Sequence, residues 1–178
     1  MATQKWISDP THSELQFKVK HLMISKVTGS FTDFTVQAET DNEDFSNASI
    51  KAKVQLDSIA TGQGDRDKHL KSADFFDTEA HPTMEFTSSN FEKKGDDEYV
   101  LSGELTIKGI TKPVELNLEY GGSAIDPWGN TKAAFSIDGK ISRKDWGLTY
   151  NAPLEAGGVM ISDEVKILGE IQLIKSAE

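Results

Sequence analysis

Strict alternation of apolar and polar residues constrains the fold of this sequence more than any other feature. In residues 14–21 the apolar side chains fall on Leu15, Phe17 and Val19, and charged or amide residues lie between them. The same alternation predicts further strands over residues 27–38, 48–56, 84–88, 99–107, 114–120, 133–141 and 165–173. Side chains of a strand point alternately to its two faces, so each strand is expected to bury one face and expose the other. This pattern is typical of antiparallel sheets.

The connections between these strands favour a barrel among all-β architectures. Eight strands fit either a sandwich or a closed up-and-down barrel. Residues 93–97 and 109–113 carry glycine with aspartate or proline, and each segment is short enough to be a hairpin loop. Consecutive hairpins favour the barrel, because Greek keys need longer crossovers. The phase of the alternation changes near Asp33, which predicts a bulge there. The length predicts one domain over residues 1–178.

A long connection over residues 57–82 holds the one short helix that the sequence predicts, after the third strand. Asp65 is a reasonable N-cap, and the helix is expected to run toward Phe75. Asp67 and Lys71 are spaced as a stabilising pair on the exposed side.

The opposite side of this helix is expected to face the sheet. Its residues follow an i, i+3, i+4, i+7 pattern and are Arg66, His69, Leu70 and Ala73. A cation and a histidine therefore lie in the stripe where apolar residues would be expected. A second long connection, residues 143–163, has the length of a lid or binding loop.

Composition excludes several classes of function. The chain has 19 Lys and Arg against 29 Asp and Glu, a net charge of -10, and only Arg66 and Arg143 among its 19 basic residues are arginines. Binding to nucleic acid or to an anionic membrane surface is therefore not expected. The absence of cysteine excludes disulfides and thiolate chemistry. No apolar run is long enough for a bilayer span or a signal peptide, so the chain is expected to be cytoplasmic and not membrane-integral.

Motifs for catalysis or metal binding are missing from the sequence. No nucleophile elbow, metalloprotease motif, P-loop or dinucleotide fingerprint occurs. The histidines, which lack metal-ligand spacing, are His12, His21, His69 and His81. The chain is therefore predicted not to be an enzyme and to have no catalytic residues, metal site or cofactor.

The apolar inner faces of the strands leave two interpretations open. An eight-stranded barrel is just wide enough either to be filled by its own side chains or to hold one small ligand. Small residues in the inward phase would leave space rather than fill it; they are Ala48, Ala52, Gly103, Ala133, Gly139 and Gly169. This pattern alone leans only slightly toward a cavity.

Ordered motifs from residue 9 to residue 174 match a known family. They are Asp9 with His12-Ser13, Phe17 with Val19-Lys20-His21, Val27-x-Gly29-x-Phe31, Ser58-Ile59-x-Thr61-Gly62, Arg66-Asp67-x-His69-Leu70, Asp74-Phe75-Phe76-Asp77 before Pro82, Gly103-x-Leu105-Thr106-Ile107-x-Gly109-x-Thr111-Lys112-Pro113-Val114 and Arg143-x-Asp145-Trp146-Gly147. On these motifs the chain resembles the YceI family of lipid-binding β-barrels, although Trp146 stands where phenylalanine is more usual.

The resemblance implies an extended, lipocalin-like, eight-stranded antiparallel barrel that encloses a long isoprenoid or fatty chain. Family members are usually dimers, and many are secreted to the periplasm, from which this chain departs because it shows no signal sequence. The inward phase then predicts a set of ligand-binding residues in the lumen: Phe17, Val19, Phe34, Val36, Ile50, Val54, Phe86, Leu105, Leu116, Phe135, Ile137 and Ile167.

The polar head group of such a ligand needs hydrogen-bond partners when it is buried. Arg66 and His69 are predicted to supply them from a helix at the mouth of the barrel, together with His21. The alternative is that Arg66 and His69 only hold the helix, by pairing with Asp74 or Asp77 and with backbone carbonyls.

Three functions therefore stay open. The first is non-catalytic binding, sequestration or transport of a polyisoprenoid, such as a prenyl quinone or its precursor, or of a fatty acyl amide. The second is an enzyme that acts on a quinone or lipid through Arg66 and His69. The third is a structural, stress-response dimer with a filled core.

Overall fold

Eleven strands, one α-helix and two short 3₁₀ helices make up the described part of the chain. The structure is a computed structural model that describes residues 3–22, 24–41, 45, 47–151 and 161–176. The strands are β1 (Gln4–Ser8), β2 (Glu14–His21), β3 (Ser25–Phe31), β4 (Phe34–Thr40), β5 (Ser49–Gln55), β6 (Ile59–Ala60), β7 (Thr83–Lys93), β8 (Glu98–Ile107), β9 (Ile110–Ile125), β10 (Thr131–Ser142) and β11 (Ile161–Lys175). The helices are η1 (Leu56–Ser58), α1 (Gly64–Lys71) and η2 (Arg143–Trp146).

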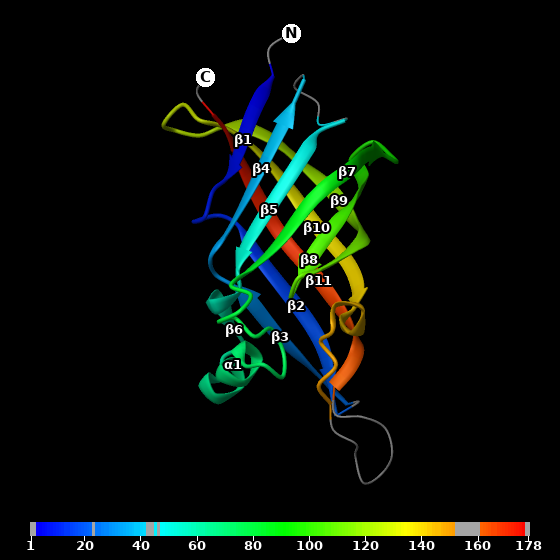
Figure 1. Cartoon of the computed structure of the whole chain (residues 1–178). Helices are drawn as coiled ribbons and strands as arrows, with labels where there is room; N and C mark the ends of the chain where they lie inside the picture. Colours follow the sequence, from blue (N-terminus) through cyan, green and yellow to red (C-terminus); the bar gives the residue numbers. More distant parts are fainter. Residues whose placement is uncertain (1–2, 23, 42–44, 46, 152–160, 177–178) are drawn as a thin grey trace.

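The strands form one antiparallel barrel (Figure 1). Eight of them pair around a closed ring in the order β1-β4-β5-β7-β8-β9-β10-β11, and β11 pairs with β1 to close it. The strand β11 pairs with β1 near its end and with β2 along the rest of its length, after which β3 and β6 follow. The predicted extended eight-stranded antiparallel barrel is confirmed. The short helix also lies where it was predicted, in the long connection after the third predicted strand, residues 48–56.

Two interruptions separate β1 from β2 and β3 from β4. Thr32 and Asp33 lie between β3 and β4, and the Asp33 carbonyl accepts a hydrogen bond from the Gln55 amide. The phase change that predicts a bulge near Asp33 is thus an interruption where the chain changes partners, from β2 to β1 and β5. The short strand β1 was not predicted, because its five residues hold too few alternations to register.

A buried carboxylate fixes the interruption between β1 and β2. Asp9 lies 2.8 Å from Nζ of Lys132 on β10 and 2.9 Å from Nδ1 of His12, and it accepts hydrogen bonds from the amide and hydroxyl of Thr11. The hydrogen bond from Lys132 is the largest cause that holds the pKa of Asp9 well below its usual range, and those from His12 and Thr11 act in the same direction against desolvation. The Asp9 and His12 motif therefore stabilises this corner of the barrel.

The helix is shorter than the sequence predicts, and its cap is a different residue. Gln63, not Asp65, is the N-cap, and its side chain accepts a hydrogen bond from the Arg66 amide at 2.6 Å. The helix ends at Lys71 rather than near Phe75. The expected Asp67–Lys71 pair is absent from the described ion pairs, because the Asp67 carboxylate accepts hydrogen bonds from the amide and hydroxyl of Thr61. Hydrogen bonds with the preceding loop therefore determine where this helix begins and which partner Asp67 takes.

One predicted hairpin loop is confirmed and the other is wrong. Residues 94–97 connect β7 to β8 as expected. Residues 109–113 are not a loop, because β9 begins at Ile110. Lys108 and Gly109 alone form the turn, with φ of 53° and 76°. Positive φ at both residues is the geometry that two-residue hairpins favour, which explains the tight connection.

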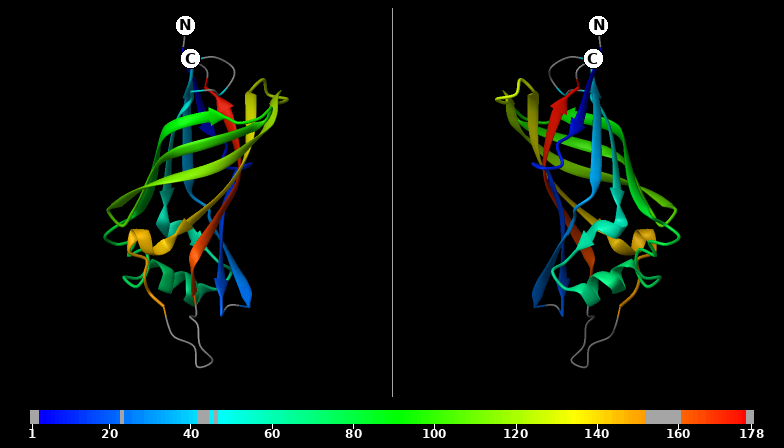
Figure 2. Two further views of the ribbon diagram at one scale, coloured as in Figure 1. Left: turned by 90° about the vertical axis from the view of Figure 1, so that its right-hand side faces the viewer. Right: turned by 90° about the vertical axis from the view of Figure 1, so that its left-hand side faces the viewer.

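One end of the barrel is filled by aromatic side chains, and Trp6 on β1 and Leu173 on β11 place this core near the chain termini. Phe135 lies at its centre, with its ring centroid 4.9 Å from that of Phe45 and 5.2 Å from that of Tyr120. The rings of Phe91 and Tyr99 pack against each other beside them, with centroids 4.8 Å apart. The helix α1 lies at the end of the barrel away from the termini (Figures 1 and 2). One end of the lumen is thus a packed core.

Candidate functional site

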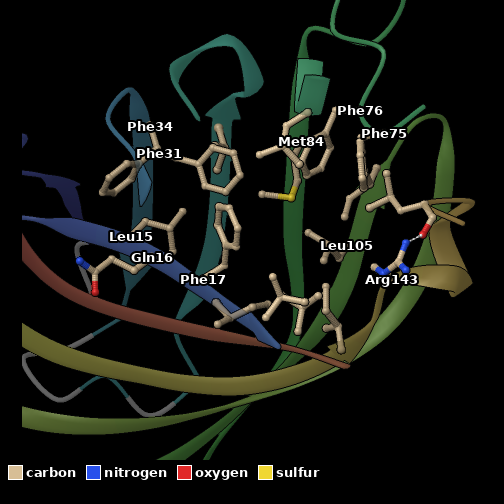
Figure 3. Close-up of a pocket in the computed structure, with 18 of the residues that line it drawn as sticks. Leu15, Gln16, Phe17, Phe31, Phe34, Phe75, Phe76, Met84, Leu105 and Arg143 are labelled. Atoms are coloured by element: carbon tan, nitrogen blue, oxygen red, sulfur yellow. Dashed lines mark hydrogen bonds between the residues drawn. The ribbon is translucent and has the colours of Figure 1, made fainter. Parts of the chain in front are cut away.

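A cavity of about 570 Å³ occupies the part of the barrel that α1 borders (Figure 3). Its walls are almost entirely aliphatic and aromatic. Most of the predicted lumen residues lie in this wall: Phe17, Val19, Phe34, Val36, Ile50, Val54, Phe86, Leu105, Leu116, Ile137 and Ile167. Period-two alternation therefore places these side chains on the inner surface, and contact with a ligand stays a prediction for each of them.

Phe135 does not line the cavity. It follows the same inward phase as Ile137 on β10, but its side chain is 5% exposed and packs in the aromatic core. Periodicity tells which face a side chain occupies but not how far along the barrel the space begins. The prediction of Phe135 as a ligand contact is therefore not supported by its position.

The sequence predicts that six small inward-facing residues leave empty space in the lumen. This prediction is wrong for most of them. A Cβ at Gly103 would lie 2.6 Å from Cζ of Phe86, and one at Gly139 would lie 2.5 Å from Cδ2 of Leu116. Large neighbours therefore already fill the room that these glycines leave. Of the six small residues only Ala52 lines the cavity, while Ala48 and Ala133 are buried in the packed core.

The helix α1 forms one side of the cavity mouth. Gln63, Asp65, Arg66, His69 and Leu70 all border the cavity, so three residues of the predicted stripe face inward, whereas Ala73 lies beyond the end of the helix and does not line the cavity. A helix that packed only on apolar core would not carry three charged or titratable residues on this face. Their position makes the mouth polar where the interior is apolar.

The predicted head-group residues meet at this cavity, and two of them already have partners. Arg66 donates from Nε to the Thr61 hydroxyl at 2.8 Å and from Nη2 to the Thr61 carbonyl at 2.7 Å. Nε2 of His69 lies 2.9 Å from the Asp74 carboxylate. His21 borders the cavity from the end of β2.

These contacts are the ones expected if Arg66 and His69 hold the helix in place. These contacts leave donors of Arg66 and part of the His69 ring available to a ligand. The guanidinium of Arg66 has five donors, of which Thr61 takes two among the described residues, and the residue is exposed. The His69 side chain is 41% exposed, and its ring contacts those of Phe75 and Tyr150 at centroid distances of 5.1 and 4.8 Å. Both residues can hold the helix and still meet a ligand at the mouth.

Arg143 borders the cavity, and sequence reasoning did not assign it there. The residue is 4% exposed. Its guanidinium donates to the backbone carbonyls of Leu148, Tyr150, Ile161 and Ser162. Burial lowers the pKa of Arg143, and the nearby Asp163 carboxylate acts in the opposite direction. With its donors committed to the backbone, Arg143 joins the segment after η2 to the start of β11 rather than offering a head-group site.

Other wall residues were also missed. Leu15 and Phe31 follow the inward phase and could have been found by it, whereas Phe76 and Leu148 lie outside the strands, where periodicity gives no signal. Met84 on β7 belongs to the predicted strand over residues 84–88 and lines the cavity, but it was not among the predicted lumen residues.

The described cavity wall contains no serine, threonine or cysteine. A serine, threonine or cysteine nucleophile is therefore missing from the part of the wall that the structure describes, which does include the phenol of Tyr150. Within the described ranges, no three His, Asp or Glu side chains are grouped to hold a metal ion. No helix among the described residues is long and apolar enough to cross a membrane.

Comparisons with known proteins agree with this architecture. A family model described as a YceI-like domain matches residues 6–173. A Staphylococcus aureus protein designated UPF0312 is 42% identical over 159 residues, which cover 89% of this chain and 90% of the relative. The crystal structure of a Campylobacter jejuni YCEI protein is similar with a TM-score of 0.76 and 31% identity, over 90% of this chain and 91% of that one. A polyisoprenoid binding domain from Saccharophagus degradans shares the fold, with a TM-score of 0.66 and 16% identity over 96% and 98% of the two chains.

Proposed function

This chain belongs to the YceI-like family, and on that basis we propose that it binds one long-chain amphiphile, a polyisoprenoid or a fatty chain, in its barrel and carries it without chemical change. The observation that carries the proposal is the apolar cavity of about 570 Å³, which lies within the range of small-molecule sites. The polyisoprenoid binding domain from S. degradans, which shares the fold, supports the same class of ligand.

The chain of the ligand, more than its head group, is expected to set the affinity. Each methylene group buried in the cavity contributes about 0.8 kcal/mol, so ten of them contribute about 8 kcal/mol before the costs of association. A charge-assisted hydrogen bond at the head contributes about 1.5–3 kcal/mol. The head group therefore fixes orientation and selects among chains of similar length.

Arg66, His69 and His21 are proposed to receive an oxygen-bearing head group at the mouth. Arg66 suits this role because its guanidinium is exposed beside the cavity and still has donors to offer. A phenol, quinone or phosphate oxygen at the mouth would accept from these donors, while the chain extends inward past Phe17 and Leu105.

The two other functions receive less support from the geometry. An enzyme that acts through a serine, threonine or cysteine nucleophile would need that residue in the wall, and the described wall offers none of the three. A filled structural core would leave no room, whereas the described residues fill this barrel at its aromatic end and enclose a cavity of about 570 Å³ in the other part. Homodimer formation, a stress response and a cytoplasmic location stay predictions.

A chain-length series tests the proposal. Delipidated protein is titrated with prenyl alcohols and fatty amides of increasing length, followed by calorimetry. Affinity is expected to rise about fourfold per added methylene until the cavity is full, and then to level off. Affinity that does not depend on chain length, or no binding by any member of the series, would contradict the proposal.

A further inference from the structure

An apolar hairpin tip lies beside the cavity mouth. The residues between β2 and β3 include Ile24, which is 86% exposed, and Leu22, which is 39% exposed. Leu22 has φ of 58°, a left-handed backbone that asparagine or glycine adopts more readily. His21, the residue on β2 next to Leu22, and Val27, the third residue of β3, line the cavity. Aliphatic side chains thus occupy a turn where polar residues are usual, at the rim through which a ligand would pass.

The outer surface of the adjoining strands carries five lysines that the sheet register brings together. Lys20 on β2 lies opposite Lys26 on β3, and Lys18 on β2 lies opposite Lys166 on β11. Lys166 in turn lies opposite Lys140 on β10. Neighbouring strands are about 5 Å apart, and alternate residues of one strand about 7 Å, so the five form one compact basic patch. We call Lys18, Lys20, Lys26, Lys140 and Lys166 the lysine patch.

The alternation places this patch on the outside of the barrel. Val19, Val27 and Val165, which alternate with the lysines, line the cavity from within. Lys20 also borders the mouth, so the lysine patch reaches the cavity entrance.

Like charges opposite each other destabilise a sheet. Within the described residues, no carboxylate forms an ion pair with any of the five lysines. Three carboxylates flank the patch: Asp138 and Glu164 are each two residues away from one of its lysines, and Glu115 on β9 follows the Gly139–Leu116 pair beside Lys140. The patch thus gathers five lysines on one face of a chain whose net charge is -10.

We propose that the lysine patch and the apolar tip of Leu22 and Ile24 dock the mouth of the barrel onto an anionic phospholipid surface. An inserted aliphatic group together with several lysines is the combination that gives reversible membrane binding. The tip and the patch are contiguous, because Lys20 and Lys26 are each two residues from the tip. Nucleic acid would use the charges but not the aliphatic tip. The docking extends the proposed function. Loading of a ligand through the docked mouth rests on that proposed function.

The lysines of the patch come from three separate segments, residues 18–26, 140 and 166, and only strand pairing places them side by side. This is why the sequence alone indicates no affinity for an anionic surface.

Flotation with lipid vesicles tests the docking. The protein is mixed with vesicles of phosphatidylcholine alone, or of phosphatidylcholine and phosphatidylglycerol in equal parts. The full chain is expected to float only with the anionic vesicles and to dissociate from them as salt is raised. Failure to bind the anionic vesicles, or equal binding to both kinds, would overturn the proposal.

Charge variants localise the contact. The double variant Lys18→Gln/Lys166→Gln is expected to weaken vesicle binding by about thirtyfold, since each lysine near an anionic surface contributes about fivefold. The matched control is Lys51→Gln/Lys53→Gln, which removes two lysines from the outer surface of β5 and is expected to bind nearly as the original chain does. An equal loss in both variants would show that net charge, not the patch, governs binding, and would overturn the proposal.

Tip variants test the orientation. Ile24→Ser is expected to weaken vesicle binding by about tenfold or more. The control Ile125→Ser changes another exposed isoleucine, 73% accessible, at the end of β9. Ile125 pairs with Thr131, and the next residue, Lys132, pairs with Ile174 near the C-terminus. Greater loss from Ile125→Ser than from Ile24→Ser would refute docking through the mouth.

Uptake of a detergent-dispersed prenyl alcohol is measured on the same variants. It is expected to be unchanged in all of them, because none lies in the inner wall. Vesicle binding without uptake would refute the proposed cargo and leave the docking standing, whereas uptake without vesicle binding would refute the docking alone. Binding to soluble heparin but not to vesicles would likewise overturn the lipid surface as partner.

Discussion

Replacing Ile137 by tryptophan separates a ligand cavity from a packed core at one point of the lumen. Ile137 lies in the middle of β10, opposite Gly169 on β11 and Leu118 on β9, and its side chain lines the cavity. Tryptophan has about six more side-chain atoms than isoleucine, enough to displace about six methylene-sized groups of a ligand. The loss of their burial costs about 5 kcal/mol, so the affinity for a long prenyl chain is expected to fall more than a thousandfold.

The stability of the empty variant should hardly change, because the indole enters unoccupied space. Overpacking a filled core costs about 1–3 kcal/mol, and each kcal/mol shifts the melting temperature by about 2–4 °C in a chain of this size. Thermal unfolding of the delipidated protein, followed by circular dichroism, and calorimetric uptake of a prenyl alcohol give the two readouts.

Phe135→Trp is the matched control, two residues away on the same strand and in the same phase. Phe135 lies in the aromatic core rather than in the cavity wall, so its replacement is expected to lower the melting temperature and leave uptake intact. If Ile137→Trp instead destabilises the protein as Phe135→Trp does, with uptake preserved, the reasoning about the cavity is refuted.

Three further perturbations test other parts of the structure. Arg66→Ala is expected to weaken binding of a prenyl alcohol by about 1.5–3 kcal/mol and that of the corresponding hydrocarbon much less; an equal calorimetric loss for both would mean that Arg66 only holds the helix. Asp9→Asn removes the negative charge of the ion pair with Lys132 and is expected to cost about 1.5–3 kcal/mol in denaturant unfolding at neutral pH. The folded-state pKa of Asp9 is depressed, so its stabilisation is complete above the unfolded pKa near 4 and is lost as pH falls through the folded value; the difference between variant and original should shrink in acid, and a constant difference would contradict this. Trp146→Phe removes the indole N–H that donates to the Leu105 carbonyl at 2.8 Å and is expected to lower thermal stability by about 1–3 kcal/mol, while an unchanged melting curve would show that this bond contributes nothing.

Alternation alone predicted much of the fold, because burial of one strand face leaves a direct mark on the sequence. It assigned Phe17, Leu105 and Ile167 to the inner surface, where they line the cavity. It could not tell where the packed core gives way to space, which is why Phe135 was placed with the ligand contacts. The position along the barrel at which the core ends and the cavity begins depends on which strands are interrupted and which loops cover the ends.

Features that depend on tertiary contacts could not be predicted from the sequence. The helix begins at Gly64 after a Gln63 cap, because the Asp67 carboxylate turns back to Thr61 rather than pairing along the helix. The buried guanidinium of Arg143 finds its carbonyl partners between residues 148 and 162, and no local pattern announces such contacts.

The most direct test of lumen binding is mass spectrometry of an organic extract of the native protein, purified without detergent. The extract is expected to contain one class of amphiphile with a long prenyl or acyl chain, in an amount comparable to the protein, and to lose it when Ile137→Trp is purified in the same way. An extract without lipid, from a protein that also takes up neither prenyl quinones nor fatty amides, would contradict the assignment of the barrel as a lipid carrier.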